Sequence, residues 1–214
     1  LRNSSAASDV YKRQTKGNSH FTDVTNASRT MLYNINDDCW DDELLDLFKI
    51  NKNILPEVKN CADDYGTIDP SFFGEKIQIG GVAGDQQAAT IGQACFKEGM
   101  IKSTYGTGCF MLMNTGKNLV SSNSQLLSTT AFNILGQKNF ALEGSIFNAG
   151  TVVQWMRDEM NFIYEAYEIE DLAHKSQNKV QFVPAFTGLG APYWKSDVRG
   201  QISGITRNTS KSDI

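Results

Sequence analysis

One acidic side chain, Asp85, is a candidate for acid or base chemistry because of its place in the stretch GGVAGDQQAAT at residues 80–90. A short apolar run and several glycines precede it, and amide and small side chains follow it. A carboxylate at the end of a strand, beside a cleft, can accept the proton of a substrate hydroxyl as a general base. The structural alternative is a helix N-cap, a position that aspartate fills well.

Two glycine-containing segments could hold phosphate groups. In the first, Thr107 lies between two glycines in the tetrapeptide YGTG, where backbone N–H groups and one hydroxyl suit phosphate oxygens. A plain hairpin turn is the alternative. The second runs from residue 144 to Gly150, with Gln154 one turn further, near a predicted helix start where unpaired N–H groups favour anions. Close helix packing explains Gly150 equally well.

Other kinds of site have little support in the sequence. His20 and His174 lie far apart without metal-ligand spacing, and there is no G-x-S-x-G segment for a serine nucleophile. The four cysteines lack C-x-x-C spacing, so we expect free thiols.

Alternating helices and strands are expected to position the candidate residues. Apolar residues behind an acidic first turn predict a helix in DDELLDLFKI at residues 41–50. KIQIGGVAG predicts a strand at about 76–81 and a loop to Gly84. A helix is predicted to begin at Asp85 or Gln86, and its packed side is expected to carry Ala88, Ala89, Ile91 and Ala94.

The segment GMIKSTYGTGCFMLMNTG predicts two strands that close around the turn at residues 105–108. A third strand in NFALEG and a helix at about 145–160 are expected next. An acidic helix is expected in IYEAYEIEDLAHKS, followed by a strand in VQFVPAFTGLGAPYW. With a boundary at about residues 97–99, Asp85 and the Gly-Thr-Gly turn are expected on opposite sides of a cleft.

Composition excludes several classes of partner. The 214 residues are 40% hydrophobic and 21% charged with a net charge of -4, typical of a globular chain and without the basic patch that nucleic acid requires. No apolar run approaches the ~20 residues that span a bilayer, and the first residues lack the apolar region of a secretory signal. We therefore expect a cytoplasmic protein that binds neither nucleic acid nor membrane.

Four long segments together resemble the FGGY carbohydrate kinase family, and within it the members that phosphorylate glycerol. The segments are TNASRTMLYNI, VAGDQQAATIGQACFKEGMIKSTYGTGCFMLMNTG, FALEGSIFNAGTVVQWMRDEM and VPAFTGLGAPYW, and the likeness covers roughly residues 18–214. It implies part of an α/β, two-domain kinase fold of the actin, Hsp70 and hexokinase type (ribonuclease H-like), with ATP and polyol meeting in the cleft. The chain is expected to be an internal portion of such a kinase, inactive alone.

The resemblance also implies a division of the chain. Residues 1–14, LRNSSAASDVYKRQ, do not lead into the pattern that follows, and we expect them to be a non-native leader, with a native flexible tail as the alternative. Residues 15–96 would form the C-terminal part of the first domain, on the polyol side. Residues 97–214 would form the N-terminal part of the second domain, on the nucleotide side.

Roles for the residues that would contact the polyol follow from the same resemblance. Asp85 matches the catalytic base, which takes the proton of the attacking hydroxyl and also contacts the substrate. Gln86 and Phe110 match glycerol contacts, one polar and one packing on the carbon chain. The implied reaction is ATP-dependent phosphorylation of glycerol to sn-glycerol 3-phosphate.

Roles on the nucleotide side also follow from it. Thr107 matches a threonine near the transferred phosphate, and Gly150 and Gln154 match nucleotide-binding positions. ATP and Mg²⁺ are the implied cofactors, with no metal ligand assigned, and glycerol and ATP are the implied small-molecule partners. A homo-oligomer is expected for the full-length protein.

Two alternatives stay open at this stage. One is an FGGY kinase that acts on a pentulose or gluconate, and Arg29 in TNASRT argues against it because sugar-specific relatives tend to have glycine there. The other is a non-catalytic nucleotide-binding module of the actin/Hsp70 type. Asp85 with Gln86 argues against that module, since a nucleotide switch needs no base facing a polyol.

Overall fold

The computed structural model describes residues 10–214, which divide into two compact units. Unit 1 contains the described residues up to Lys102 together with Leu112–Ser122 and Leu127–Glu143. Unit 2 contains Ser103–Met111, Asn123–Leu126 and Gly144–Ile214. The first nine residues of the predicted leader lie outside the described residues. Residues 10–14 are helical, and the Tyr11 and Tyr65 ring centroids are 6.3 Å apart, while the leader boundary at residue 14 stays a prediction.

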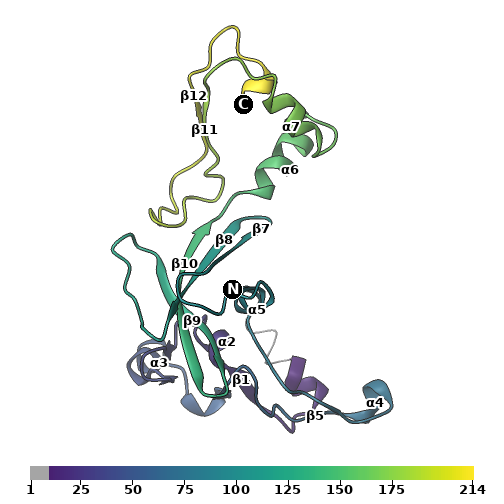
Figure 1. The fold of residues 1–214 in the computed structure, drawn as a ribbon, viewed down its shortest axis with the longest axis vertical. Coiled ribbons are helices and arrows are strands. Elements are labelled where there is room, and N and C mark those ends of the chain that lie inside the picture. Colours follow the sequence, from purple (N-terminus) through teal and green to yellow (C-terminus); the bar gives the residue numbers. More distant parts are fainter. Residues whose placement is uncertain (1–9) are drawn as a thin grey trace. The chain divides into compact units, whose positions relative to one another are not determined.

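The first part of unit 1 is built from short elements joined by turns (Figure 1). Two-stranded pairs form between β1 and β4, which are parallel, and between β2 and β3 and between β5 and β6, which are antiparallel. The elements are β1 (Phe21–Asp23), α2 (Val24–Ala27), β2 (Tyr33–Asn34), β3 (Cys39–Trp40), α3 (Asp42–Phe48), η1 (Lys52–Ile54), β4 (Glu57–Lys59), β5 (Thr67–Ile68), α4 (Pro70–Phe73), β6 (Ile77–Gln78) and α5 (Asp85–Gly92).

Helix α3 confirms the helix expected at residues 41–50. The Asp41 carboxylate accepts a hydrogen bond from the Leu44 N–H at 3.0 Å, and two further acids lie in the first turn, where the helix dipole favours negative charge. The helix ends where Lys49 adopts a left-handed conformation.

A four-stranded sheet of order β7-β8-β10-β9 follows along the chain. The strands are β7 (Ile101–Tyr105), β8 (Cys109–Gly116), β9 (Leu127–Ile134) and β10 (Gln137–Ile146). The expected hairpin around residues 105–108 is confirmed, because β7 ends and β8 begins on either side of that turn. Strand β9 was not expected, since its four consecutive buried residues, Thr129 to Phe132, do not follow the apolar–polar alternation of a half-buried strand.

Two hydrophobic clusters fill unit 1. The larger contains side chains from α2, β8, β9 and β10, with the members Val24, Cys61, Leu112, Ala131, Phe132 and Ala141. The smaller contains Tyr65, Ile79 and Val82, and Tyr11 and Phe21 pack against it. Val82 belongs to the smaller cluster and Ile91 packs against the larger one, so the clusters anchor the chain on both sides of Asp85.

Unit 2 continues with α6 (Gly150–Asp158), α7 (Glu168–Ala173), β11 (Gln181–Val183), β12 (Gln201–Ser203) and η2 (Lys211–Asp213) (Figure 1). The helix expected at 145–160 starts later, because β10 continues to Ile146 and α6 begins only at Gly150. The acidic helix expected at 163–176 is also shorter. It begins at Glu168, whose carboxylate accepts the N–H groups of Tyr164 and Glu165 at 3.1 and 2.8 Å.

Helix α5 begins where the sequence predicts, but the expected packed side is only partly right, because Ile91 packs against the larger hydrophobic cluster while two of the three alanines are exposed. The buried side chains are Gln87 and Thr90, whereas Ala88 and Ala94 are exposed and Ile91 is half-buried. The polar residues are buried because they have hydrogen-bond partners: the Thr90 hydroxyl donates to the Gln86 carbonyl at 2.9 Å. The spacing of apolar residues in the sequence does not show which polar side chains will find buried hydrogen-bond partners.

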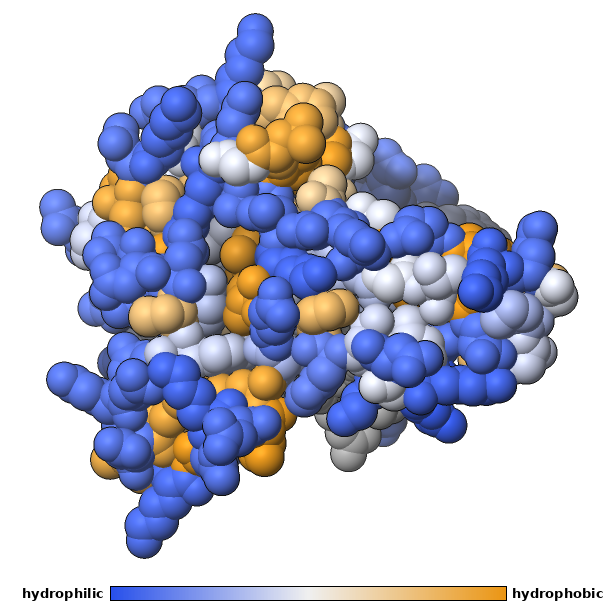
Figure 2. All heavy atoms as spheres, turned by 90° about the horizontal axis from the view of Figure 1, so that it is seen from below, coloured by the Kyte–Doolittle hydropathy of each residue, from blue (hydrophilic) through white to orange (hydrophobic). Residues whose placement is uncertain are grey.

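The surface carries apolar groups among polar ones, as one face in Figure 2 shows. Exposed large apolar side chains include Leu47, Phe73 and Leu135. Within residues 10–214, no helix has the length and apolar character needed to cross a membrane.

Candidate active site

Asp85 is the first residue of α5, and Gly84 occupies the N-cap position without any side-chain cap. The N-cap alternative for Asp85 is therefore wrong. The carboxylate is exposed, and its Oδ1 atom accepts the Gln86 N–H at 2.9 Å. A negative charge is favourable in a first helical turn, so this position holds an accessible carboxylate without making it a structural cap.

The backbone before Asp85 is held by a buried hydrogen-bond relay. The Gly84 N–H donates to the Thr25 hydroxyl oxygen at 2.8 Å, and that hydroxyl donates to Asp23 Oδ2 at 2.5 Å. Asp23 and Thr25 are both 0% exposed. A Cβ on Gly84 would lie 2.7 Å from Gln87 Oε1, so a larger residue here would displace the buried Gln87 side chain. The relay fixes the start of α5 against α2.

Gln86 has polar contacts on both sides of its amide. Lys102 Nζ donates to Gln86 Oε1, and Gln86 Nε2 lies 3.4 Å from Asp85 Oδ2. Lys102 is buried, and burial lowers its pKa, while the charges of Glu143 and Asp85 oppose that shift. Glu143 is buried as well and pairs with Arg29.

In unit 2, the hairpin turn at residues 106–108 is bonded to the start of α6. The Gly150 N–H donates to the Gly106 carbonyl at 2.8 Å, and the Ala149 N–H donates to the Thr107 carbonyl at 2.9 Å. The Thr151 hydroxyl donates to the same Thr107 oxygen at 3.1 Å. The first N–H groups of α6 thus bind the turn, whereas the sequence had suggested that they are unpaired and open to an anion.

The hydroxyl and the amide N–H of Thr107 are available to a ligand. The residue is exposed, and within the described residues neither its hydroxyl nor its amide N–H has a hydrogen-bond partner. A hydroxyl and an N–H that point out of a rigid turn can bind phosphate oxygens.

The glycines around this turn are required by close packing. A Cβ on Gly150 would lie 2.6 Å from the Gly106 carbonyl oxygen, and one on Gly108 would lie 2.4 Å from the Ile146 carbonyl oxygen. Packing therefore accounts for Gly150 in α6, and its nucleotide role stays a prediction. Gln154 is exposed one turn further along α6, and Phe110 is half-buried in β8.

The structure groups the predicted residues in two sets. Asp85 and Gln86 are neighbours at the start of α5 in unit 1. Thr107, Phe110, Gly150 and Gln154 all belong to unit 2, where the turn contacts α6.

Three residues that support the first set, Thr25, Lys102 and Glu143, were not predicted from the sequence. For Lys102, the available signal was a lysine within the strand pattern IKSTY. Its alternation with Ile101 suggests an exposed side chain, so the pattern points away from the observed burial.

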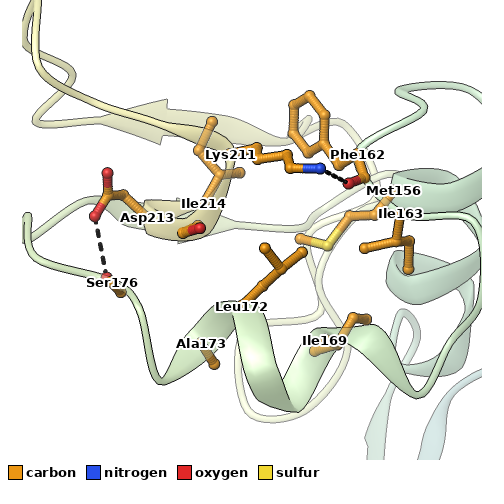
Figure 3. A pocket seen from close by; sticks show the side chains of 11 residues that line it. Met156, Phe162, Ile163, Ile169, Leu172, Ala173, Ser176, Lys211, Asp213 and Ile214 are labelled. Atoms are coloured by element: carbon orange, nitrogen blue, oxygen red, sulfur yellow. Dashed lines mark hydrogen bonds between the residues drawn. The ribbon is translucent and has the colours of Figure 1, made fainter.

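One pocket lies away from all of these residues, between α6, α7 and the C-terminal residues of unit 2 (Figure 3). It measures about 340 Å³ and is mainly apolar, with side chains such as Met156 and Leu172. Lys211 Nζ donates to the Phe162 carbonyl at 2.8 Å, and the Asp213 carboxylate accepts several N–H groups that hold its pKa far below its usual range. The polar groups are thus engaged in structure, and the pocket does not present a reactive site.

Comparison with known proteins identifies the family to which this chain belongs. The described residues form part of the two-domain α/β fold that FGGY sugar kinases share with actin and hexokinase. Residues 8–92 match the N-terminal domain, and residues 101–214 the C-terminal domain, of the FGGY family of carbohydrate kinases. The chain belongs to this family.

Curated relatives give a narrower likeness. The chain is 56% identical over 207 residues to a glycerol kinase of Brucella ovis, which covers 96% of this chain and 41% of that protein. It is 57% identical over 204 residues to a glycerol kinase of Rhizobium meliloti, covering 94% and 41%. The chain thus spans about two fifths of the length of these relatives.

Solved structures agree with the fold. A Plasmodium falciparum glycerol kinase with ADP superposes with a TM-score of 0.83 at 43% identity, covering 97% of this chain and 42% of that one. A ligand-bound xylulose kinase of Lactobacillus acidophilus has a TM-score of 0.79 at 24% identity, covering 97% and 43%. The second likeness concerns the fold alone.

Proposed function

We propose that the protein containing this chain transfers the terminal phosphoryl group of ATP to glycerol and forms sn-glycerol 3-phosphate. The observation that carries the proposal is the exposed Asp85 carboxylate at the first position of α5, held by the Gly84 relay and next to Gln86. The names of the relatives that match most of this chain support the substrate. Assignment of residues 15–96 to the polyol side and 97–214 to the nucleotide side belongs to this proposal.

The proposed chemistry at Asp85 is proton removal. Its carboxylate accepts the proton of the attacking glycerol hydroxyl as the new oxygen–phosphorus bond forms and the bond to the departing ADP oxygen breaks. Gln86 supplies a polar contact to glycerol, and the Phe110 ring supplies an apolar surface for its carbon chain. Such positioning is the main requirement for phosphoryl transfer, which needs little covalent chemistry from the protein.

The hairpin turn is proposed to hold phosphate oxygens. Thr107 offers an exposed hydroxyl and N–H, and the bonds between the turn and α6 keep both groups in place. Gly150 and Gln154 are proposed to lie along the nucleotide. The Plasmodium falciparum glycerol kinase was solved with ADP, which supports a nucleotide for this chain as well.

Mg²⁺ is part of the proposal, and the residues are compatible with it. The described residues contain no group of three metal-binding side chains. Mg²⁺ bound to nucleotide usually takes one or two carboxylates and otherwise phosphate and water oxygens, so it does not require a dedicated cluster of protein ligands, and no residue of this chain is assigned to it. When bound, the ion neutralises phosphate charge during transfer.

The decisive experiment replaces Asp85 by asparagine in the complete gene product. We expect kcat for glycerol to fall by at least ~10²-fold, the scale of a lost general base, while ATP affinity changes little. Asp42→Asn is the matched control, because Asp42 is also the exposed first residue of a unit 1 helix. Turnover of Asp85→Asn close to that of wild type would remove the proposed base.

Substrate and assembly are tested on the same preparation. We expect wild-type protein to phosphorylate glycerol in preference to xylulose and gluconate, and preferred turnover of either sugar would replace the proposed substrate. The cytoplasmic location, expected from the lack of a membrane-spanning run and of a secretory signal, and the homo-oligomer stay predictions, which fractionation and light scattering can check.

A further inference from the structure

Lys102 occupies an unusual place for a lysine. It is the second residue of β7 and only 1% exposed, whereas the preceding Ile101 is 52% exposed. The strand thus buries its charged side chain and exposes its apolar one, the reverse of the usual preference. Burial of an ammonium group is costly unless polar partners surround it, so this side chain calls for a specific explanation.

The contact between Lys102 and Gln86 determines which way the Gln86 amide faces. A lysine ammonium has only donors, and a glutamine side chain has one carbonyl acceptor and one NH₂ donor. Since Lys102 Nζ donates to Gln86 Oε1, the NH₂ group must take the other position, 3.4 Å from Asp85 Oδ2. The opposite orientation would place an NH₂ group against the ammonium and a carbonyl oxygen against the carboxylate.

Acidic groups compensate the buried ammonium. The charges of Glu143 and Asp85 both favour the protonated form of Lys102 and oppose the lowering of its pKa by burial. Glu143 is in turn held by Arg29. These charged groups and Gln86 all belong to unit 1, so they form one network within a single unit.

We propose that Lys102 is a positioning residue that fixes the Gln86 amide with its NH₂ group toward Asp85, and so sets the donor that the polyol site offers to a substrate hydroxyl. The inference rests on the proposed glycerol-phosphorylating function. Lys102 acts through Gln86 and needs no contact with substrate.

A double-mutant cycle in the complete gene product tests this dependence. Lys102→Met and Gln86→Leu should each lower kcat/KM for glycerol by about 10-fold, the equivalent of one hydrogen bond to a charged or well-oriented partner. KM for ATP should stay within about twofold of wild type in both. The double variant should be no worse than the poorer single variant, because both changes remove the same oriented amide.

Lys138→Met is the matched control. Lys138 is also a largely buried lysine of unit 1, paired with Asp38, and within residues 10–214 no hydrogen bond or ion pair joins it to the start of α5. This variant should keep kcat/KM for glycerol even if its melting temperature falls. If Lys102→Met does not fold, Lys102→Gln replaces it, since a shorter neutral amide no longer imposes one orientation on Gln86.

The possible outcomes distinguish failure of the positioning role of Lys102 from failure of the proposed function. If wild-type protein phosphorylates glycerol but the effects of the two single variants multiply in the double variant, Lys102 does not act through Gln86 and the inference fails. Unchanged glycerol kinetics in a folded Lys102 variant overturn it as well. Wild-type protein that does not phosphorylate glycerol would instead reject the proposed function.

Discussion

Arg29 and Glu143 form a bidentate ion pair that links the segment after α2 to strand β10. Arg29 Nη1 lies 2.6 Å from Glu143 Oε2, and Nη2 lies 3.0 Å from Oε1. The Glu143 side chain is 1% exposed and that of Arg29 is 32% exposed. In the sequence, Arg29 served only as a marker against sugar-specific relatives, and the structure gives it a physical role in holding a buried carboxylate.

Replacing Arg29 and replacing Glu143 should lower the free energy of unfolding by different amounts. Arg29→Met leaves the buried carboxylate without its guanidinium and should destabilise the protein by about 3–5 kcal/mol, the range for a broken buried ion pair. Glu143→Gln should cost less, since the partly exposed guanidinium can turn to water and the Asp85 charge still favours the protonated form of the buried Lys102. Urea unfolding of both variants measures the difference, and equal costs would contradict this explanation.

The relay from Asp23 to Gly84 should matter for both stability and turnover. Thr25→Val keeps the side-chain shape but leaves the buried Gly84 N–H without its acceptor, at a cost of about 1–3 kcal/mol. Because Gly84 immediately precedes Asp85, we also expect a lower kcat for glycerol in the complete gene product. Steady-state assays at a temperature well below the melting point separate this effect from unfolding.

Thr30→Val provides the control for Thr25→Val. The Thr30 hydroxyl donates to the Ala27 carbonyl at 2.7 Å in the same unit, and among the described residues no hydrogen bond links Thr30 to α5. Its replacement should lower stability without changing kcat. Equal loss of turnover in the two variants would show that the relay has no particular role at Asp85.

The sequence predicts elements best where local rules decide the structure. Asp41 before an acidic turn marks the start of α3, and the glycines around Thr107 mark the hairpin, because caps and turns depend on residues close in the chain. The start of α6 was misplaced because Ile146 extends a strand whose partners lie far away in the sequence. Sheet pairing overrides local apolar spacing there.

The candidate site was predictable only in part for a similar reason. Asp85 and Gln86 could be singled out because the glycines and the motif lie beside them in the chain. Lys102 could not, since its partner Gln86 is 16 residues away and the strand alternation points to the opposite face. Which polar side chain is buried depends on partners that only the folded chain brings together.

The buried Cys61 thiol should react with alkylating reagents far more slowly than an exposed thiol. Burial raises its pKa to about 12, and the nearby Asp23 charge acts in the same direction. The reactive form is the thiolate, so iodoacetamide at about pH 8.5 should modify the exposed Cys39 and leave Cys61 intact until urea unfolds the chain. Mass spectrometry of the peptides reads out both sites, and early modification of Cys61 would contradict its burial.

The same shift gives a pH dependence of stability. The folded state keeps the Cys61 thiol neutral, whereas an unfolded thiol ionises near pH ~8.5. The contribution of Cys61 is therefore complete below that pH and is lost as pH rises toward about 12. Urea midpoints of wild type and Cys61→Ala should converge over this interval, and parallel curves would exclude the effect.

Gly150→Ala tests whether the contact between α6 and the hairpin turn places Thr107. An alanine Cβ would lie 2.6 Å from the Gly106 carbonyl oxygen, so the turn or the helix must move. Overpacking of this kind costs about 1–3 kcal/mol, and displacement by about 1 Å can lower turnover by ~10²-fold. Gly92→Ala is the control, since it is also a helical glycine but has open space around its Cβ position, and it should be neutral or slightly stabilising. We expect Gly150→Ala in the complete gene product to raise KM for ATP and lower kcat while Gly92→Ala does neither, and unchanged ATP kinetics in Gly150→Ala would show that the turn does not hold the nucleotide.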